Sequence, residues 1–536
     1  MKKTIILGIM FGFICICCAI TMNTNSKSKL YFVMDSDSLT VVVESDDCNE
    51  LIYPVIRQGI NYYFLPSFVD INSISGDRLS SATDIRIDED RISSTSNIDV
   101  QYGQKYDLSV NGQACEAIFL RADNVASIFL ETSTGDMEYV EQEKGNIDVG
   151  KLQVIDQNAV CWYSGDFSIA GRGNSTWVAF KKPYRLELSE KANLFGMGEA
   201  KEWVLLANTY DSSYMNNVLA YDMSSYVGIP YTPQTEYVNL YCNGAYWGLY
   251  LLSEKVEVGK ERINITNLKE ANSIANNGMD LSTAQTFDYY NKRGVILENN
   301  PEDITGGYLL EINYRSASDV LKDRQYPESW FETSLKTSID IVSPRYASCE
   351  EVDYISELIE NMVEAFAADD GFSSEGRYYT EYIDLESWVK WYMASEIPYD
   401  LDKGKTSTYM YKDIDNVSNG IYMGPVWDYD LRWNEDPQVL TKLNDIGNVQ
   451  WYSQLYDKPE FYNAIVEYWP IYKYYLEELA PERIDVWESE IESSVEMDNI
   501  RWGREDYNLA DKTDELKEWI TLRTEYLDTC WSGDAN

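Results

Sequence analysis

The stretch Gly171-Arg172-Gly173-Asn174-Ser175-Thr176-Trp177, followed closely by Lys181-Lys182-Pro183-Tyr184-Arg185, is the most informative part of the chain. It places a glycine-rich turn and four basic side chains within residues 171–185 of a protein whose formal net charge is −45. Because so acidic a protein repels anions over most of its surface, this local group of basic residues predicts a polyanionic ligand such as a nucleoside triphosphate. The alternative is a surface hairpin whose basic residues pair with nearby carboxylates, since a short glycine pattern is weak evidence by itself.

The composition limits the classes of partner. The 536 residues correspond to two to four domains of roughly 150 residues each, and a hydrophobic fraction of 44% is enough for sizeable cores. Acidic residues number 89 and basic residues 44, whereas nucleic-acid backbones are bound by basic surfaces. The composition therefore argues against a nucleic-acid partner, and it suits a soluble protein in an exposed or salty setting or one whose partner is cationic.

The sequence contains no histidine. This excludes Ser-His-Asp and Cys-His catalysis, histidine-ligated zinc and a histidine general base. Proton abstraction would then require Asp, Glu, Lys, Tyr or Cys. A hard cation held by carboxylate oxygens, Mg²⁺ or Mn²⁺, remains compatible with the composition.

The N-terminus is typical of a secretory signal peptide, expected over residues 1–25. Lys2 and Lys3 precede an apolar run over residues 5–20, and polar residues follow. The run is shorter than the roughly 20 apolar residues of a membrane-spanning helix, and an uncleaved anchor is the alternative. We therefore expect a secreted or cell-surface protein that contacts a membrane only through this segment, if at all. The six cysteines beyond it permit disulfides but form no Cys-x-x-Cys pair.

Hydrophobic patterns divide the rest of the chain into three parts. Residues 28–130 contain short β-rich runs between polar turns and predict a β-rich N-terminal domain of sandwich type. Residues 131–440 continue as strands, with a hairpin at Asn243-Gly244, and then become helical. Residues 441–536 are expected to form a C-terminal helical region. The expected fold class is α+β, with a β-rich lobe, a helix-rich lobe and a cleft between them.

Apolar residues at helical spacing predict individual helices in this plan. They occur over residues 213–227, 350–366 and 385–397, and residues 461–527 are expected to be largely helical. Residues 264–300 are polar and predict a loop-rich segment.

Two acidic clusters, at Asp400-Leu-Asp402 and Trp427-Asp428-Tyr429-Asp430, stand out in the helical part. Two short strands between them predict a hairpin that brings the clusters together, and carboxylates at its ends can share a divalent cation. Ser407 lies five positions after Asp402, and protein kinases use an Asp and a metal-binding residue at this spacing, with a second metal-binding Asp downstream. With 89 acids, chance patterns in solvated turns are the alternative.

With these residues the chain resembles the CotH kinase-like family, which is named for a spore-coat protein and is distantly related in fold to protein kinases. The resemblance extends over about residues 160–433. Its segments, in order, include Gly171-Arg-Gly-Asn-Ser-Thr-Trp177, Lys181-Lys-Pro-Tyr-Arg-Leu-Glu187, Trp203-Val-Leu-Leu-Ala-Asn208, Asp211-Ser-Ser-Tyr-Met-Asn216, Tyr241-Cys-Asn-Gly-Ala-Tyr-Trp-Gly-Leu-Tyr250, Ser253-Glu254, Gly307-Tyr-Leu-Leu-Glu311 and Gly424-Pro-Val-Trp-Asp-Tyr-Asp430. It implies an atypical protein-kinase-like, two-lobed fold and phosphorylation of protein Ser or Thr with ATP and Mg²⁺ or Mn²⁺.

The resemblance also implies roles for particular residues. The phosphates would be covered by Gly171, Arg172, Gly173, Asn174 and Ser175 and contacted by Lys182 or Lys181. Glu254 or Glu311 would orient that lysine. Asp402 would be the catalytic base, and the metal would be held by Asp428, with Asp430 and Ser407 as further ligands.

A second hypothesis is a surface adhesion or coat scaffold that keeps the fold with weak or no catalysis. The chain has Ser407 where many kinase-like loops have Asn, and Arg432-Trp433-Asn434 where Gly is expected. The basic cluster and the acids Asp402 and Asp428 favour the enzyme. For either role, a cationic, Ser-rich protein partner would suit the acidic surface.

Overall fold

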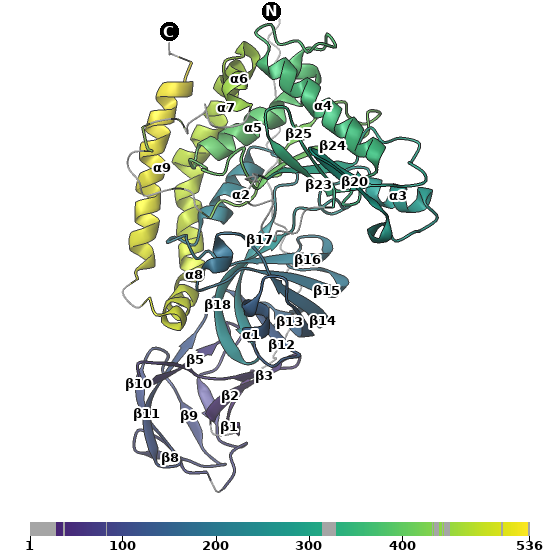
Figure 1. Cartoon of the computed structure of the whole chain (residues 1–536). Coiled ribbons are helices and arrows are strands. Elements are labelled where there is room, and N and C mark those ends of the chain that lie inside the picture. Colours follow the sequence, from purple (N-terminus) through teal and green to yellow (C-terminus); the bar gives the residue numbers. More distant parts are fainter. Residues whose placement is uncertain are drawn as a thin grey trace, which may run out of the picture.

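The computed structural model describes residues 28–35, 38–81, 83–313, 328–430, 433, 439–441, 443, 451–504 and 507–533. The expected signal peptide, Arg432 and Asn434 lie outside these ranges. The described residues form N-terminal β-sheets, a central β-barrel and a helix-rich C-terminal region (Figure 1), which confirms the predicted α+β class.

Two sheets make up the N-terminal part. In spatial order the first contains β3 (Asn49–Ile52), β2 (Ser38–Glu44), β1 (Lys29–Asp35), β6 (Ser73–Ser75) and β9 (Asn97–Asp99). The second contains β4 (Val55–Arg57), β5 (Ile60–Leu65), β11 (Gln113–Arg121), β10 (Lys105–Val110), β7 (Ile85–Ile87) and β8 (Asp90–Ile92). Their buried side chains form one cluster, which also takes in Phe129, Tyr241, Tyr246 and Met497 from later parts of the chain. The N-terminal sheets therefore share a core with the rest of the molecule.

A closed barrel follows, where the sequence predicted only a β-rich lobe. Its strands, in spatial order, are β12 (Ala126–Thr132), β13 (Ile147–Ile155), β14 (Cys161–Gly171), β15 (Tyr184–Asn193), β16 (Glu199–Leu206), β18 (Ala245–Glu254) and β17 (Thr235–Cys242). Parallel pairing of β12 with β17 closes it. Asn243 and Gly244 both have positive φ between β17 and β18, as a two-residue hairpin turn requires. The predicted hairpin is confirmed, and α1 (Glu138–Gln142) lies between β12 and β13.

A second, seven-stranded sheet belongs to the upper part of the molecule in Figure 1. Its order is β19 (Thr286–Tyr289), β20 (Lys292–Val295), β22 (Trp330–Glu332), β23 (Ser338–Ser343), β21 (Tyr308–Ile312), β24 (Thr408–Lys412) and β25 (Tyr422–Met423). The prediction of loops over residues 264–300 is wrong in part, because α3 (Leu268–Ala275), β19 and β20 lie there. Asn267 accepts a hydrogen bond from Glu270 N and caps α3.

The predicted helices are confirmed. α2 (Asn216–Tyr226) lies between β16 and β17, and α4 (Cys349–Ala367) begins with a capping box of Ser348 and Glu351. Asp384 caps α5 (Leu385–Glu396). The C-terminal part contains α6 (Tyr452–Tyr456), α7 (Pro459–Tyr474), a π-helical turn (Tyr475–Leu479), α8 (Ala480–Trp502) and α9 (Leu509–Trp531).

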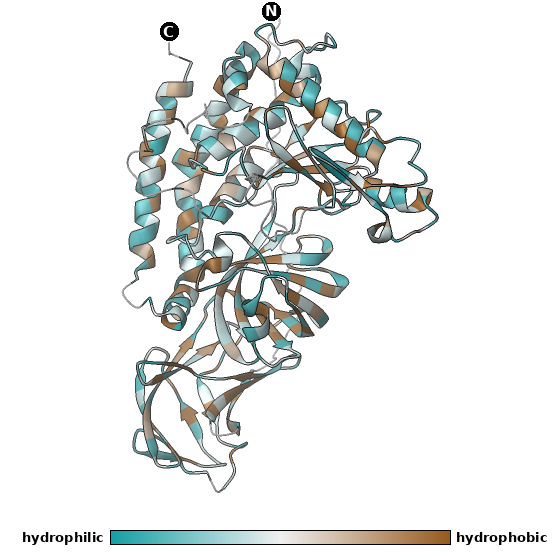
Figure 2. Ribbon diagram, in the orientation of Figure 1, coloured by the Kyte–Doolittle hydropathy of each residue, from teal (hydrophilic) through white to brown (hydrophobic). Residues whose placement is uncertain are grey.

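Helix α8 connects the helix-rich region to the barrel. It runs along one side of the molecule beside β18, and α9 packs against it (Figure 1). In Figure 2 brown, hydrophobic residues alternate with teal, hydrophilic ones along both helices, as expected for helices with one buried face. Among the residues that the structure describes, no helix is both long and apolar enough to span a membrane.

Candidate functional site

The glycine-rich segment connects β14 to β15, and the space around Gly171 and Gly173 leaves no room for a side chain at either position. Gly171 is the last residue of β14, and a Cβ at this position would overlap the Trp177 ring. Gly173 has a φ of 84°, and a Cβ there would overlap Thr176 Oγ1. A short 3₁₀ turn (Thr176–Val178) follows. The segment is therefore a tight, close-packed loop whose form requires glycine.

Lys144, which the sequence analysis missed, lies against this loop. Its Nζ donates to Gly173 O at 2.6 Å and to Asn174 Oδ1 at 3.3 Å. Asn174 and Ser175 are exposed, and Tyr210 holds the Ser175 carbonyl with a hydrogen bond of 3.0 Å. No sequence signal separates Lys144 from other exposed lysines, because its contact depends on the β12–β13 connection folding onto the loop.

Arg172 connects this loop to the second acidic cluster. The Arg172 guanidinium carbon is 5.2 Å from the centroid of the Trp427 ring, and Trp427 immediately precedes Asp428. Trp427 also stacks on Tyr221 of α2, with ring centroids 6.3 Å apart. The structure thus brings together the two segments that the sequence singled out separately.

Arg172 and Asp428 both influence the hydroxyls of Tyr221 and Tyr409. Burial raises the pKa of Tyr221, the charge of Asp428 raises it further, and Arg172 lowers it. Burial likewise raises the pKa of Tyr409, which Glu311 and Asp428 raise further and Arg172 lowers. Since such effects act over short distances, both hydroxyls lie within the electrostatic reach of Arg172 and of Asp428.

Asp428 is held in a defined orientation. Ser407 Oγ donates to Asp428 Oδ2 at 2.8 Å, and both residues have positive φ, 50° for Ser407 and 69° for Asp428. Helix α2 fixes the following residue, because Tyr429 N donates to Asn217 Oδ1 at 2.8 Å. Positive φ at non-glycine residues is uncommon and occurs often at functional sites.

Asp402 lies at the start of the turn that leads to Ser407. Its carbonyl accepts from Lys405 N at 2.8 Å and from Thr406 N at 3.2 Å. The predicted hairpin between the acidic clusters is confirmed, with β24 antiparallel to β25. Asp402, Ser407, Asp428 and Asp430 are all half-buried, so each retains some access to a ligand.

Lys181 was expected to contact the phosphates, and Glu254 or Glu311 to orient the phosphate-binding lysine. In the structure these three residues have other contacts. Lys181 is 1% exposed and forms an ion pair with Asp498 of α8 at 2.9 Å. Glu254 pairs with Arg262 at 2.5 Å instead of a lysine, because Arg262 is brought to it by the chain that follows β18. Glu311 of β21 accepts a hydrogen bond from Tyr409 on the neighbouring strand β24.

Lys182 differs from Lys181 in its surroundings. Its Nζ donates to Trp177 O at 2.7 Å and to Ala179 O at 3.1 Å and lies 4.8 Å from the centroid of the Trp177 ring. Within the described part of the chain, Lys182 has no carboxylate partner. The half-buried ammonium beside the glycine-rich loop is therefore suited to an anionic ligand.

The residues present fit a phosphate-bound divalent cation better than a metal site made by protein alone. No group of three or more Cys, Asp or Glu side chains in the described ranges could hold a metal ion. Mg²⁺, however, is commonly held by one or two carboxylates together with substrate phosphates and water. Asp428, with Asp430 two residues later, can supply such carboxylates.

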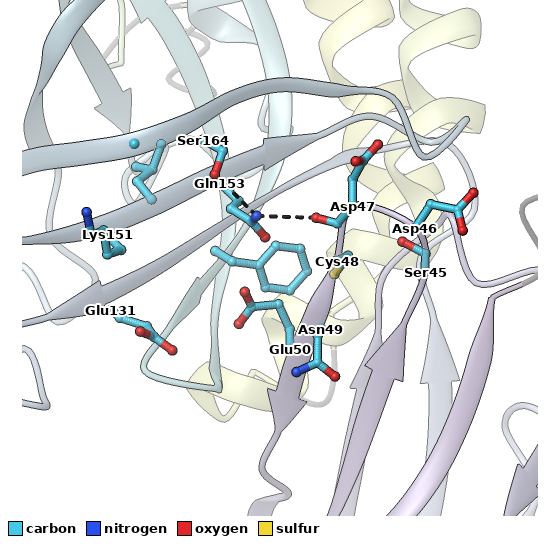
Figure 3. A pocket seen from close by; sticks show the side chains of 13 residues that line it. Ser45, Asp46, Asp47, Cys48, Asn49, Glu50, Glu131, Lys151, Gln153 and Ser164 are labelled. Atoms are coloured by element: carbon cyan, nitrogen blue, oxygen red, sulfur yellow. Dashed lines mark hydrogen bonds between the residues drawn. The ribbon is translucent and has the colours of Figure 1, made fainter.

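A separate pocket of about 600 Å³ lies between the β2–β3 turn and barrel strands β12, β13 and β14. Figure 3 shows Asp47 and Glu50 on one side of it, and Glu131, Gln153 and Ser164 on the other. Gln153 Nε2 donates to Asp47 O at 3.2 Å. Burial raises the pKa of Glu50 to about 7, and the nearby Glu131 contributes to the rise. Neither Arg172 nor Asp428 is among the residues that line this pocket.

The described cysteines, Cys48, Cys115, Cys161, Cys242, Cys349 and Cys530, are all free thiols. Disulfides that the sequence permitted are therefore absent from the part of the chain described in the structure.

Comparison with known proteins identifies the family. No curated protein matches the chain. The model of the CotH kinase protein family matches residues 169–527, which is more than half of the chain and contains the glycine-rich loop, both acidic clusters, α8 and most of α9. On this match, the chain belongs to the CotH kinase protein family, a family of atypical kinases.

Proposed function

We propose that the chain is a metal-dependent protein kinase with an atypical two-lobed fold, which transfers the γ-phosphoryl group of ATP to a Ser or Thr hydroxyl. The contact of Arg172 with Trp427 carries this proposal, because it joins a residue of the glycine-rich loop to the residue that immediately precedes Asp428. Family membership supports ATP as the phosphoryl donor. The barrel and the helix-rich region, joined by α8, would be the two lobes.

The glycine-rich loop and three basic side chains would bind the phosphates. Arg172 and Lys182 are half-buried beside the loop, and Lys144 reaches it from the β12–β13 connection. The exposed residues Asn174 and Ser175 form the outer side of the turn. Charged donors of this kind form the stronger hydrogen bonds to phosphate oxygens.

Asp428 would hold Mg²⁺ or Mn²⁺ against the phosphates, with Asp430 as the second carboxylate. When bound, the metal would neutralise charge on the phosphate oxygens. In the structure, Ser407 keeps the Asp428 carboxylate in place with its hydrogen bond of 2.8 Å. Ser407 would therefore act on the metal mainly through the orientation of Asp428.

Asp402 would accept the proton of the substrate hydroxyl. The hydroxyl oxygen forms a bond to the γ-phosphorus, the bond from that phosphorus to the β–γ bridging oxygen breaks, and ADP leaves. A carboxylate is the suitable base in a chain without histidine. The backbone hydrogen bonds to the Asp402 carbonyl fix the turn from which its side chain projects.

The location and the substrate are further parts of the proposal. Lys2, Lys3 and the apolar run over residues 5–20 support export to the cell surface or beyond. A net charge of −45 supports a cationic, Ser-rich protein substrate and argues against nucleic acid. N-terminal sequencing of exported protein that still begins at Met1 would favour an uncleaved anchor.

The test is phosphoryl transfer from γ-labelled ATP with Mg²⁺ or Mn²⁺, either to the protein itself or to a basic Ser-rich peptide. Asp402→Asn should abolish transfer and largely retain ATP binding, because it removes a proton acceptor and keeps the shape. Asp428→Asn should abolish transfer and weaken metal-dependent ATP binding. Asp166→Asn, which changes an exposed acid of β14, is the control and should behave as wild type. Full transfer activity in both site variants would refute this mechanism.

A catalytically weak surface or coat scaffold of the same fold is the second candidate. The observation that favours it is the identity of residue 407, because a Ser hydroxyl that donates to Asp428 is a poorer metal ligand than the amide oxygen of Asn. Wild-type protein that shows neither metal-dependent ATP binding nor transfer would support the scaffold.

A further inference from the structure

A buried ion pair connects the C-terminal helix α8 to the basic segment after the glycine-rich loop. Lys181 Nζ lies 2.9 Å from Asp498 Oδ1, and the two side chains are 1% and 0% exposed. Lys181 also donates to the Leu249 carbonyl of β18, and its Nζ lies 4.7 Å from the centroid of the Tyr250 ring. Removing Asp498 would leave the buried ammonium of Lys181 uncompensated, so the buried position of Lys181 depends on Asp498.

Asp498 uses both carboxylate oxygens to join several segments. Oδ1 accepts from Leu249 N at 2.9 Å, in addition to Lys181. Oδ2 accepts from Tyr214 OH at 2.8 Å and from Arg504 Nη2 at 2.8 Å. A Cβ at Gly248 would overlap Asp498 Oδ1, so β18 approaches the carboxylate as closely as glycine permits. The cluster joins α8 to β18, to the start of α2 and to the segment after the loop.

We infer that Asp498 is a positioning residue for nucleotide binding: by holding Lys181 in the interior, it fixes the base of the glycine-rich loop and directs Lys182 to the opposite side, toward the phosphates. This inference rests on the proposed kinase function. It also gives α8, which is distant in sequence, a part in forming the nucleotide site.

The two lysines have different surroundings. Lys182 precedes Pro183, and a residue before proline is confined to extended conformations. Lys181 lies in a bend and its side chain is buried against Asp498, whereas the side chain of Lys182 is half-buried beside the loop. Lys182 indeed donates to Trp177 O and Ala179 O inside the loop. The carbonyl of Lys181 is fixed by Thr209 Oγ1 at 2.7 Å, and that of Lys182 by Tyr250 OH at 3.1 Å.

The ion pair between Lys181 and Asp498 depends on pH, because Lys181 must be protonated to form it. Burial lowers the pKa of Lys181 to about 8, although Asp498 acts to raise it. The groups that face its ammonium are Asp498 of α8, Arg504 beyond α8, Tyr214 before α2 and Tyr250 of β18. As the pH rises above about 8, Lys181 loses its proton and the ion pair with Asp498 is lost.

The first test compares Lys181→Met with wild type. Methionine keeps an unbranched apolar stem, and Asp498 keeps its bonds to Leu249 N, Tyr214 and Arg504. The KM for ATP should rise about tenfold with kcat changed much less, because the variant loosens a binding loop and leaves the reacting groups intact. Lys517→Met, which breaks the pair between α9 and Asp485 of α8 at 2.5 Å, is the matched control and should keep the wild-type KM. An equal KM in Lys181→Met and wild type would overturn the inference.

A second test needs neither nucleotide nor catalysis, and so separates this inference from the proposed function. Hydrogen exchange of residues 172–180 should be faster in Lys181→Met than in wild type and in Lys517→Met. In wild type, the protection factors of the amides in this segment, which take the intrinsic exchange rate into account, should fall between pH 7 and pH 9. Unchanged protection at pH 9 would contradict the inference, even if Lys181→Met failed to fold or the wild type failed to bind ATP.

Discussion

Ser407 illustrates how much of the site depends on single hydrogen bonds. Its hydroxyl donates to Asp428 at 2.8 Å, and its φ of 50° suits Asn as well as Ser. Ser407→Ala should lower metal-dependent transfer about tenfold, since a hydrogen bond to a charged group contributes about 1.5–3 kcal/mol. Ser407→Asn should retain or raise activity at low Mn²⁺, because the amide oxygen is a metal ligand. The check is kcat over a Mn²⁺ titration, and wild-type kcat in Ser407→Ala would count against this role.

The neighbouring lysines should give opposite phenotypes. Lys182→Ala should weaken ATP binding at least about tenfold with little change in the melting temperature, because the ammonium is half-buried beside the loop and would contact phosphate in the proposed site. Lys181→Ala should instead lower the melting temperature, because Asp498 is left without one of its two ion-pair partners. Calorimetric titration and thermal melts measure the two effects. Lys201→Ala, which removes another barrel lysine bonded to a carbonyl, serves as control; an equal loss of ATP affinity in this variant would make the Lys182 effect unspecific.

Sequence reasoning identified the loop but could not assign its two lysines. Lys181 and Lys182 are equivalent in any local pattern, and only the tertiary position of Asp498 separates them. Nothing in the sequence selects Asp498 from 89 acids, or Arg262 as the partner of Glu254. Gly171 and Gly173 were predictable, because the turn chemistry that requires glycine is local.

At the scale of elements, the glycine-rich loop should tolerate no side chain at its first glycine. A methyl group at Gly171 would overlap the Trp177 ring, which lies against Lys182. Gly171→Ala should therefore weaken ATP binding about tenfold and destabilise the fold by about 1–3 kcal/mol through overpacking. Gly259→Ala, whose added Cβ would meet only ordinary contacts, is the control. Unaltered ATP affinity in Gly171→Ala, measured by calorimetry, would show that the loop does not approach the nucleotide.

Some of the helices and strands could be predicted from the sequence. Helices α2, α4 and α5 follow from their apolar spacing, and the β17–β18 hairpin from Asn243-Gly244. Closure of the barrel could not be predicted, because the parallel pairing of β12 with β17 joins strands that are distant in sequence. The hairpin between the acidic clusters was predictable from its length, whereas the approach of Arg172 to Trp427 depends on how the barrel and α2 pack.

At the scale of the whole molecule, stability should fall as the pH rises from about 5 to 8. Burial raises the pKa of Glu50, Glu236 and Glu351 to about 7 each. The folded state therefore binds more protons than the unfolded state between about pH 4.5 and 7, and the free energy of unfolding decreases as pH rises through that range. For the fully buried Glu351 the effect is on the order of 3 kcal/mol, and self-repulsion of the acidic surface acts in the same direction.

Thermal melts at pH 5.5, 6.5 and 8 measure this dependence. Glu351→Gln should make the melting temperature depend less on pH and should raise it at pH 8, because the variant has no carboxyl group to ionise. The amide oxygen can still accept the hydrogen bonds from Ser348 N and Asn272. Glu360→Gln, at an α4 residue that accepts from Ser334 N, should keep the wild-type dependence of the melting temperature on pH. A melting temperature that is equal at pH 5.5 and pH 8 would contradict the raised pKa values of these glutamates.

The family match and the contacts of α8 agree that the C-terminal helices belong with the kinase-like part. The match runs to residue 527, and Asp498 of α8 binds the segment next to the glycine-rich loop. From sequence, residues 441–536 were expected as a separate helical region, because apolar periodicity identifies helices but not the surfaces on which they pack.

The most direct test of the proposed nucleotide site is a structure of the protein with a non-hydrolysable ATP analogue and Mn²⁺, in which the metal is located by its anomalous scattering. We expect Mn²⁺ bound to the Asp428 carboxylate and to phosphate oxygens, with the phosphates under residues 171–175 and beside Lys182. A nucleotide bound elsewhere, or a metal that does not contact Asp428, would contradict the proposed site.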